Sequence, residues 1–588
     1  MMEDEANLEA ALNAAPSEMR SDEPTMARII GLGGLGLTVL GCAAMIANQY
    51  GPRFVGTTGG FLFAFLGILA LLFHAFRDGD IEFRRLYTFA GMIILALAII
   101  GSIIPGKPES ETVARQMAYY FLPWGPLAAT IALLFLIASG RHETAAGMTK
   151  TVNLLLLAVG SLLTASSIVL GVIKPDTLAG PGLLVALVGL AYLCSYLSRA
   201  GTMDGMGRFV GVSLGILGGF SLFYAVARSL FPTILYDGPR VLKTATQSYD
   251  PILLGGRLFL IALFSAAAYV CARRWNTLFF TRVFVSLALG LIALVLAIGT
   301  VTAPLKEPLN PFLVPGGLIL GLLGTVYLAF SLAYCSDSPF VALVGREMAS
   351  FFVSPIAYLV LIGVSIISIY GYGILLIPFV EQPGIPQLEP IVGNYWAASM
   401  GGAFLVVVIV PAITMRLFSE EKRTGSLEVL LTAPISEWSV LGSKFLAAWF
   451  FYMITWVPLG LYLVGLRAAG NAFDYRPMLS YYLVQAACGA GFISMGVFFS
   501  CLTRNQIIAA VLSFTGCFVL LLTIVIKSLP LGELWAPVKA VSARLDYMTA
   551  WQSALNGQLS YSFVVAYLSM MVFWLFATAK VLESRRWS

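Results

Sequence analysis

The residues best able to carry function form one charged run inside an otherwise apolar stretch. Glu420, Glu421, Lys422 and Arg423 follow one another directly. Four adjacent charges cannot enter hydrocarbon, so we expect them to end the preceding membrane span in water. The chemistry that such a run offers is ion pairing at a membrane surface.

The residues after this run predict a short helix. Gly425 allows a sharp turn, Ser426 can cap a first helical turn, and Pro434 stops the helix. Three apolar side chains share one face at helical spacing: Leu427, Leu430 and Leu431. A short helix with one apolar face, placed between two membrane spans, is suited to docking into a groove on a soluble partner. The alternative is a solvated turn between helices.

A second candidate segment begins at Ser338, a good N-cap, followed by Pro339 at the first helical position. Arg346 and Glu347 point away from an apolar face formed by Phe340, Leu343, Val344, Met348 and Phe351. This pattern predicts an amphipathic helix along the membrane surface. The alternative is the cytoplasmic end of a long membrane helix.

No catalytic or metal chemistry is indicated elsewhere. The two histidines, His74 and His142, are too few for a metal centre and favour packing or interfacial roles. The seven cysteines fit neither a metal site nor a disulfide framework: Cys42, Cys194, Cys271, Cys335, Cys488, Cys501 and Cys517.

One segment approaches a phosphate-binding loop. Gly101 to Lys107 has the spacing of such a loop, but Pro108 stands where a Ser or Thr hydroxyl must hold Mg²⁺. No soluble stretch is long enough for a nucleotide-binding domain, which needs on the order of 200 residues. We therefore predict no ATPase site, and no enzyme activity, in this chain.

The elements that position these residues are membrane helices. The chain has 588 residues, of which 59% are hydrophobic and 11% charged, a composition that excludes a soluble globular protein. Apolar runs reach the roughly 20 residues that a helix needs to cross a bilayer. The predicted fold class is an all-α polytopic membrane helix bundle.

About sixteen spans are predicted, in a group of ten and a group of six. The first group lies near 28–48, 54–76, 86–105, 118–139, 151–173, 180–198, 208–231, 252–272, 283–303 and 312–335. The second lies near 352–378, 397–416, 437–466, 478–503, 505–527 and 562–582, with a long outer segment from Ser528 to Ser560. Glycine clusters at Gly31 to Gly36 and Gly215 to Gly219 predict close helix packing.

These groups suggest three regions. Residues 1–25 form an acidic tail that we expect to be disordered and cytoplasmic, 26–335 a membrane domain without an assigned function, and 336–588 a second membrane domain. Basic residues are more frequent in the predicted inner loops, and this bias places both termini in the cytoplasm.

The second domain carries motifs of a known family. They include Arg346-Glu347, Ser354-Pro355, Thr414-Met415-Arg416, the run from Glu420 to Pro434, Leu441 to Phe445, Leu545-Asp546-Tyr547, Asn556-Gly557 and Tyr561. Residues of about 340–588 thereby resemble the permease subunits of ABC-2 type exporters, most of all the gliding-motility-associated group. The chain departs from that group at Asn556, where Arg is frequent.

The resemblance implies a permease of the cell inner membrane that is driven by a separate ABC ATPase, which binds ATP and Mg²⁺. A second permease copy or a related permease, and membrane lipids, complete the expected partners; no nucleic acid is expected. Contact with the ATPase is implied, by resemblance, for Arg346, Glu347, Glu420, Glu421, Lys422, Arg423, Thr424, Gly425, Leu427, Glu428, Leu430 and Leu431.

Other functions stay open from the residues alone. An ion-coupled secondary transporter usually keeps carboxylates inside the bilayer, and none stands in the middle of a predicted span. The first ten spans are also compatible with a scaffold module fused to the permease. A membrane enzyme is least favoured, because no clustered catalytic set is present.

Overall fold

The computed structural model describes most of the predicted membrane segments. It covers residues 23–50, 57–77, 81–103, 125–140, 146–173, 178, 181–200, 205–230, 258, 261–262, 264–269, 279–302, 317–336, 338–381, 401–427, 436–468, 476–528, 535–558 and 560–586. Every regular element in these ranges is a helix, which confirms the predicted all-α class there. Most of the predicted acidic tail and of the span at 252–272 lie outside them.

The chain divides into two compact units, which we describe separately. Unit 1 comprises Met1–Val169 and Leu183–Gly207, and unit 2 comprises Leu170–Gly182 and Arg208–Ser588. The predicted domain boundary near residue 336 therefore lies within unit 2.

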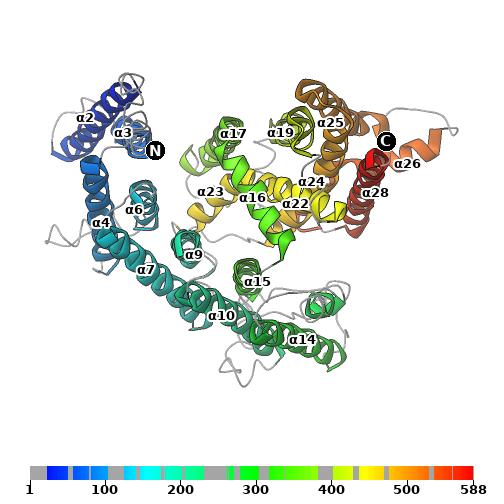
Figure 1. Ribbon diagram of the computed structural model, residues 1–588, viewed down its shortest axis with the longest axis horizontal. Helices are drawn as coiled ribbons and strands as arrows, with labels where there is room; N and C mark the ends of the chain where they lie inside the picture. Colours follow the sequence, from blue (N-terminus) through cyan, green and yellow to red (C-terminus); the bar gives the residue numbers. More distant parts are fainter. Residues whose placement is uncertain are drawn as a thin grey trace, which may run out of the picture. The chain divides into compact units, whose positions relative to one another are not determined.

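Unit 1 contains the helices coloured blue to cyan in Figure 1. They are α2 (Glu23–Tyr50), α3 (Thr57–Arg77), α4 (Ile81–Ile103), α6 (Gly125–Gly140), most of α7 (Ala146–Ile173) and most of α9 (Pro181–Ala200).

Helices α2 and α3 approach each other at glycine positions. A Cβ atom at Gly34 would lie 2.7 Å from the Cβ of Ala70, and one at Gly41 would lie 2.3 Å from the backbone nitrogen of Ala64. Side chains larger than hydrogen therefore have no room, as the glycine cluster predicted. Gly33 and Gly36 of the same cluster meet nothing within 4 Å. His74 is buried and shares a 2.7 Å hydrogen bond with the Tyr87 hydroxyl, in agreement with the predicted packing role.

Unit 2 begins with three helices and continues with those that carry the candidate site. The first three are α10 (Gly205–Leu230), α14 (Phe279–Thr302) and α15 (Gly317–Tyr334). The others are α16 (Pro339–Val353), α17 (Pro355–Glu381), α19 (Gly401–Thr414), α20 (Ser419–Thr424), α22 (Glu437–Thr455), α23 (Val457–Ala468), α24 (Arg476–Leu502), α25 (Gln506–Ser528), α26 (Ala536–Leu545), α27 (Tyr547–Leu555) and α28 (Tyr561–Arg586).

Helix α24 is the centre of this bundle. Of the apolar stretch that makes α24 a candidate span, 78% is buried, against at most 56% for the other candidate spans in the described residues. It packs against α22, α25, α27 and α28, and tyrosines and tryptophans fill the space between them. Trp551 of α27, for example, is fully buried and contacts Trp456 and Tyr481 edge to face.

Eight helices in the described residues are long and apolar enough to cross a membrane. Three belong to the first predicted group and five to the second: Thr149–Ile173, Gly182–Arg199, Gly205–Ala227, Ile356–Leu375, Glu437–Leu463, Pro477–Leu502, Gln506–Ile526 and Tyr561–Ser584. Five shorter apolar helices coincide with further predicted spans, and so does α15, the first helix of the bent pair of α15 and α16. The chain is thus a multi-pass membrane protein, and the number of about sixteen stays a prediction.

Helix α16 begins where the sequence indicated, after Ser338 and with Pro339 in its first turn, although the Ser338 side chain makes no capping hydrogen bond. It ends at Ser354 in extended conformation, and Pro355 starts α17. This break separates α16 from the following span, as expected for a surface helix. In Figure 1, α16 crosses α22, against which it packs.

Candidate functional site

Lys444 lies at the centre of a buried group of charges in unit 2. The residue is 1% exposed on α22. Its Nζ donates to Glu347 Oε2 of α16 at 3.1 Å and to Glu421 Oε1 of α20 at 2.7 Å. A buried ammonium group is costly without such partners. Lys444 therefore joins its own helix α22 to both α16 and α20. We call Arg346, Glu347, Glu421 and Lys444 the Lys444 cluster.

The cluster extends to the surface through Arg346. Its Nη2 donates to Glu347 Oε1 at 2.8 Å, and its side chain is 55% exposed while that of Glu347 is 9% exposed. Glu347 therefore uses both carboxylate oxygens, one toward the buried Lys444 and one toward the exposed Arg346. A partner that contacts Arg346 would act on the buried ion pairs through this one carboxylate.

Arg416 makes a second link, from the end of α19. Its Nε lies 3.4 Å from Glu420 Oε2 and its Nη1 donates to Ser354 Oγ. Ser354 is the residue at which α16 ends and α17 begins. Glu420 of the charged run is thus joined through Arg416 to the break between α16 and α17.

Helix α20 is held in place by the last turn of α24. Ser500 Oγ accepts hydrogen bonds from the backbone N–H groups of Phe418 and Ser419, at 3.1 and 3.3 Å. Lys422 donates to the Cys501 carbonyl oxygen, a favourable position because the last carbonyls of a helix lack partners within it. Gly425 then ends α20 with φ 75°, the left-handed conformation that favours glycine.

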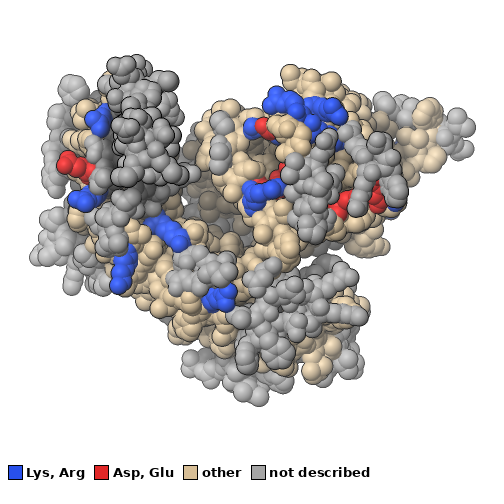
Figure 2. Space-filling model, in the orientation of Figure 1, with Lys and Arg blue, Asp and Glu red and all other residues tan. Residues whose placement is uncertain are grey.

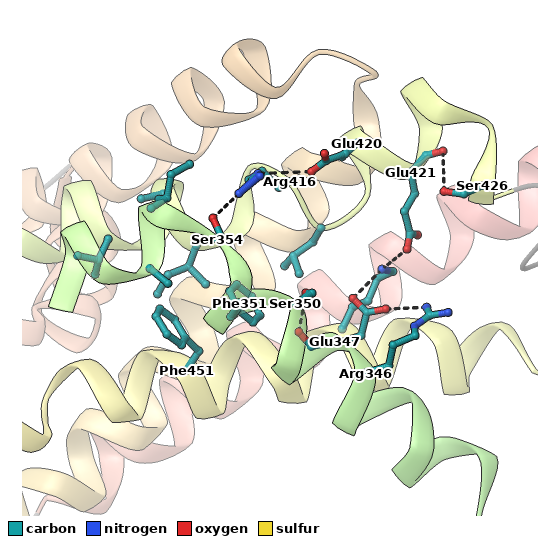
Figure 3. A pocket seen from close by; sticks show the side chains of 17 residues that line it. Arg346, Glu347, Ser350, Phe351, Ser354, Arg416, Glu420, Glu421, Ser426 and Phe451 are labelled. Carbon is teal, nitrogen blue, oxygen red and sulfur yellow. Dashed lines mark hydrogen bonds and ion pairs between the residues drawn. The ribbon is translucent and has the colours of Figure 1, made fainter. Parts of the chain in front are cut away.

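A cleft of about 810 Å³ opens between α16, α17, α19, α20 and α22. The Lys444 cluster and the Arg416–Glu420 pair line it together with apolar side chains (Figure 3). Glu421 Oε2 is buried without a hydrogen-bond partner in the described part of the chain. The space-filling view shows side chains of both charges gathered where Figure 1 draws α16 and α19 (Figure 2).

The structure brings several predicted site residues together. Arg346, Glu347, Glu420 and Glu421 line one cleft, whereas Arg423 and Thr424 are exposed on α20. Leu427 is buried, 4% exposed, on the far side of the Gly425 turn. Glu428, Leu430 and Leu431 lie outside the described residues.

The charged run has a structure that the sequence did not indicate. It follows the end of α19 at Thr414 and forms helix α20 itself, and its Lys422 is 9% exposed. The physical reason is that α24 supplies acceptors for the lysine. The helix predicted after Ser426 falls largely on residues outside the described ranges.

The sequence also left out residues that the structure makes central. Lys444, Arg416 and Ser500 were not among the predicted site residues, yet they hold α16, α19 and α20 together. A signal for Lys444 was present, because it is the only basic residue of α22 in EWSVLGSKFLAAWFFYMIT. A charge in such a position requires a partner. Arg416 stood in the motif Thr414-Met415-Arg416, and Lys444 in the motif from Leu441 to Phe445, but Ser500 gave no comparable signal.

Comparison with known proteins supports a transporter domain in unit 2. Residues 386–575 match the model of a family described as ABC-2 family transporter protein. No curated protein and no solved structure matches the chain. The matched range includes α20 and Lys444 but begins after α16, so Arg346 and Glu347 lie outside it.

The fold and the match together limit the class of the protein. It is a multi-pass helical membrane protein in which residues 386–575 match the model of ABC-2 family transporter domains. Domains of this kind are permeases that lack an ATPase site of their own and imply an ABC ATPase as partner. The resemblance to the gliding-motility group stays a prediction.

Proposed function

We propose that this chain is the permease subunit of an ABC-2 type exporter in the cell inner membrane. A separate ATPase binds ATP and Mg²⁺ and hydrolyses the nucleotide, and the permease spans carry substrate outward. A second copy of the chain or a related permease completes the transporter. The observation that carries this proposal is the Lys444 cluster, which lies partly within the matched ABC-2 domain.

The ion pairs of this cluster suit a mechanical coupling. Lys444 binds carboxylates on α16 and α20 at 3.1 and 2.7 Å, so a displacement of either helix is transmitted to α22. Helix α22 belongs to the candidate span Glu437–Leu463. A partner shifts such an arrangement only by binding one conformation better than the other. The exposed side chains of Arg346 and Arg423 are where we place that differential contact.

Orientation follows from the same residues. With both termini in the cytoplasm, α20 and the exposed end of α16 face the cytoplasm, where an ATPase is accessible. Helices α26 and α27 then belong to the long segment on the opposite side of the membrane. The distribution of basic residues supports this placement.

An affinity purification from the native membrane tests the proposal. The solubilised chain is captured, copurifying proteins are identified, and ATPase activity is measured. Arg423→Glu reverses an exposed charge on α20, and Arg544→Glu reverses an exposed charge on α26 as the matched control. We expect an ABC ATPase with the wild type and with the control, and a clear loss with Arg423→Glu.

Two results would contradict the proposal. One is an intact wild-type protein that copurifies without any ATPase, which would favour ion-coupled transport or a scaffold. The other is an ATPase that Arg423→Glu and Arg544→Glu retain equally. Glu421 is not used in this test because its substitution also disturbs the buried Lys444.

A further inference from the structure

Helix α20 and the last turn of α24 form one packed junction. Phe418, the N-cap residue of α20, makes no side-chain cap of its own. Ser500 Oγ, 82 residues further along the chain, accepts the backbone N–H groups of Phe418 and Ser419 instead. Lys422 adds a bond to the Cys501 carbonyl oxygen. Side chains exposed on this junction are therefore presented to a partner by a single packed body.

The link between α24 and α25 is short and held by its own hydrogen bonds. Residues 503–505 connect the two helices. The Asn505 backbone N–H donates to Thr503 Oγ1 at 3.0 Å, and Asn505 Oδ1 accepts from the Ile507 N–H at 2.9 Å, which caps the start of α25. Arg504 is exposed between these two polar residues. Its backbone is thus fixed at a corner of the bundle.

The charge of Arg504 does not serve the stability of either helix. Arg504 directly precedes the cap residue of α25, and a positive charge at a helix N-terminus opposes the helix dipole. A basic residue at the end of α24 could bind the last carbonyl groups, but Lys422 already occupies the Cys501 carbonyl. Arg504 has no hydrogen bond or ion pair with another described residue. Its guanidinium group is therefore available to a partner.

A second exposed cation lies on the same junction. Arg423 follows Lys422 on α20, is exposed, and likewise has no hydrogen bond or ion pair with a described residue. Because Lys422 contacts Cys501, which stands just before the corner, Arg423 and Arg504 flank one contact. On the face shown in Figure 2, basic side chains gather where Figure 1 draws α19 and α25. Two cations on one body are complementary to an acidic surface.

We propose that the corner at residues 503–505 is a second contact of the permease with the ABC ATPase, and that Arg504 and Arg423 together bind an acidic surface of that subunit. This contact rests on the function proposed above, which places the ATPase at α20. The corner and α20 lie on the same side of the membrane because they are joined directly. The ATPase then acts on α24, the centre of the bundle, as well as on α22 through Lys444.

Charge variants of Arg504 test this contact in the complex captured from native membranes. Arg504→Glu should retain roughly tenfold less ATPase than wild type, because like charges then face each other. Arg504→Lys keeps the charge and should retain most of the ATPase. Arg544→Glu reverses an exposed charge on α26 and should retain the wild-type amount.

Thermal unfolding separates loss of the contact from loss of the fold. An acidic residue before the cap of α25 suits the helix dipole, so Arg504→Glu should unfold at a temperature no lower than that of wild type. Salt gives an independent readout. Retention of the ATPase by wild type should fall between about 0.1 and 1 M salt, as the screening length shortens from about 10 to 3 Å. Retention that is equal at both salt concentrations would overturn the acidic-surface contact.

The remaining outcomes distinguish this contact from the proposed function. Wild type that captures no ATPase would overturn both. An ATPase that is lost with Arg423→Glu but retained by Arg504→Glu would overturn the second contact alone. Lipid is the competing occupant of the corner, because the neighbouring Ile507 is 72% exposed. A photo-reactive residue at position 504 should form an adduct with the ATPase chain, and an adduct with phospholipid alone would overturn the contact.

Discussion

At the scale of single residues, Lys444 is a buried cation whose charge must be compensated by neighbouring groups. Its side chain is 2% exposed and contacts two carboxylates from different helices, while its Nζ lies 5.5 Å from the centre of the Phe418 ring. Removal of one partner from such a set leaves buried charge without compensation. Lys580 pairs with Glu583 at the surface, where water already solvates both charges.

This contrast gives the first prediction. Lys444→Met should lower the free energy of unfolding by about 3–5 kcal/mol. Glu421 then loses its ion pair with Lys444, and the buried Glu347 keeps only the exposed Arg346. Lys580→Met should change it by less than about 1 kcal/mol, because the pair is exposed to solvent. Denaturant unfolding of the two variants in the same detergent measures both values. Equal losses would show that the Lys444 cluster carries no special stability.

Gly425 gives a second prediction. Its φ of 75° is unfavourable for any residue with a Cβ, although no atom lies within 4 Å of the position that a Cβ would take. Gly425→Ala should therefore destabilise by about 1–2 kcal/mol through backbone conformation alone. Gly345→Ala on α16, which also has open space around it, should stabilise by roughly 0.5–1 kcal/mol because alanine favours a helix interior. Thermal unfolding in detergent measures whether the two variants change stability in these opposite directions.

At the scale of elements, sequence patterns predicted the apolar helices better than the short polar ones. The break between two predicted spans at 503–505 is confirmed, since α24 ends at Leu502 and α25 begins at Gln506. Arg504 and Asn505 made it visible because neither belongs in hydrocarbon. Helix α20 was missed because its stability comes from α24 rather than from its own apolar face.

Helix α27 illustrates a signal that could have been used. Asp546 is buried and caps the helix, accepting from the backbone N–H groups of Met548 and Thr549 at 3.1 and 3.2 Å. The Tyr567 hydroxyl donates to the neighbouring Leu545 carbonyl at 2.6 Å. Asp followed by a helical apolar pattern is a recognisable N-terminus. The low hydropathy of the surrounding segment hid this short helix in a search for spans.

The cap yields a third prediction. Asp546→Ala should lower the free energy of unfolding by about 1–2 kcal/mol, since two backbone donors of α27 lose their acceptor. Asp546→Asn keeps an acceptor oxygen and should cost less. Hydrogen exchange measured by mass spectrometry should show faster exchange at residues 548–555 in the alanine variant only. Unchanged exchange in that variant would contradict the assigned cap.

At the scale of the whole molecule, the composition predicted a helical membrane protein. The long apolar runs in the sequence located the eight helices of the described residues that are long and apolar enough to cross a membrane. The site was less predictable. Arg346 and Glu421 are 75 positions apart, and nothing in their local sequence shows that Lys444 joins their helices. Pairing between distant helices depends on tertiary packing, which periodicity does not report. The function of residues 26–335 likewise stays unassigned.

The proposed contact between a separate ATPase and α20 of the permease can be trapped by photo-cross-linking. A photo-reactive amino acid is placed at Arg423 or, as the control, at Arg544, and the native membranes are irradiated. Both positions are exposed. We expect an adduct with an ABC ATPase chain from position 423 and none from position 544. A folded, membrane-inserted protein that gives no ATPase adduct from position 423, or gives it from position 544 instead, would exclude this contact.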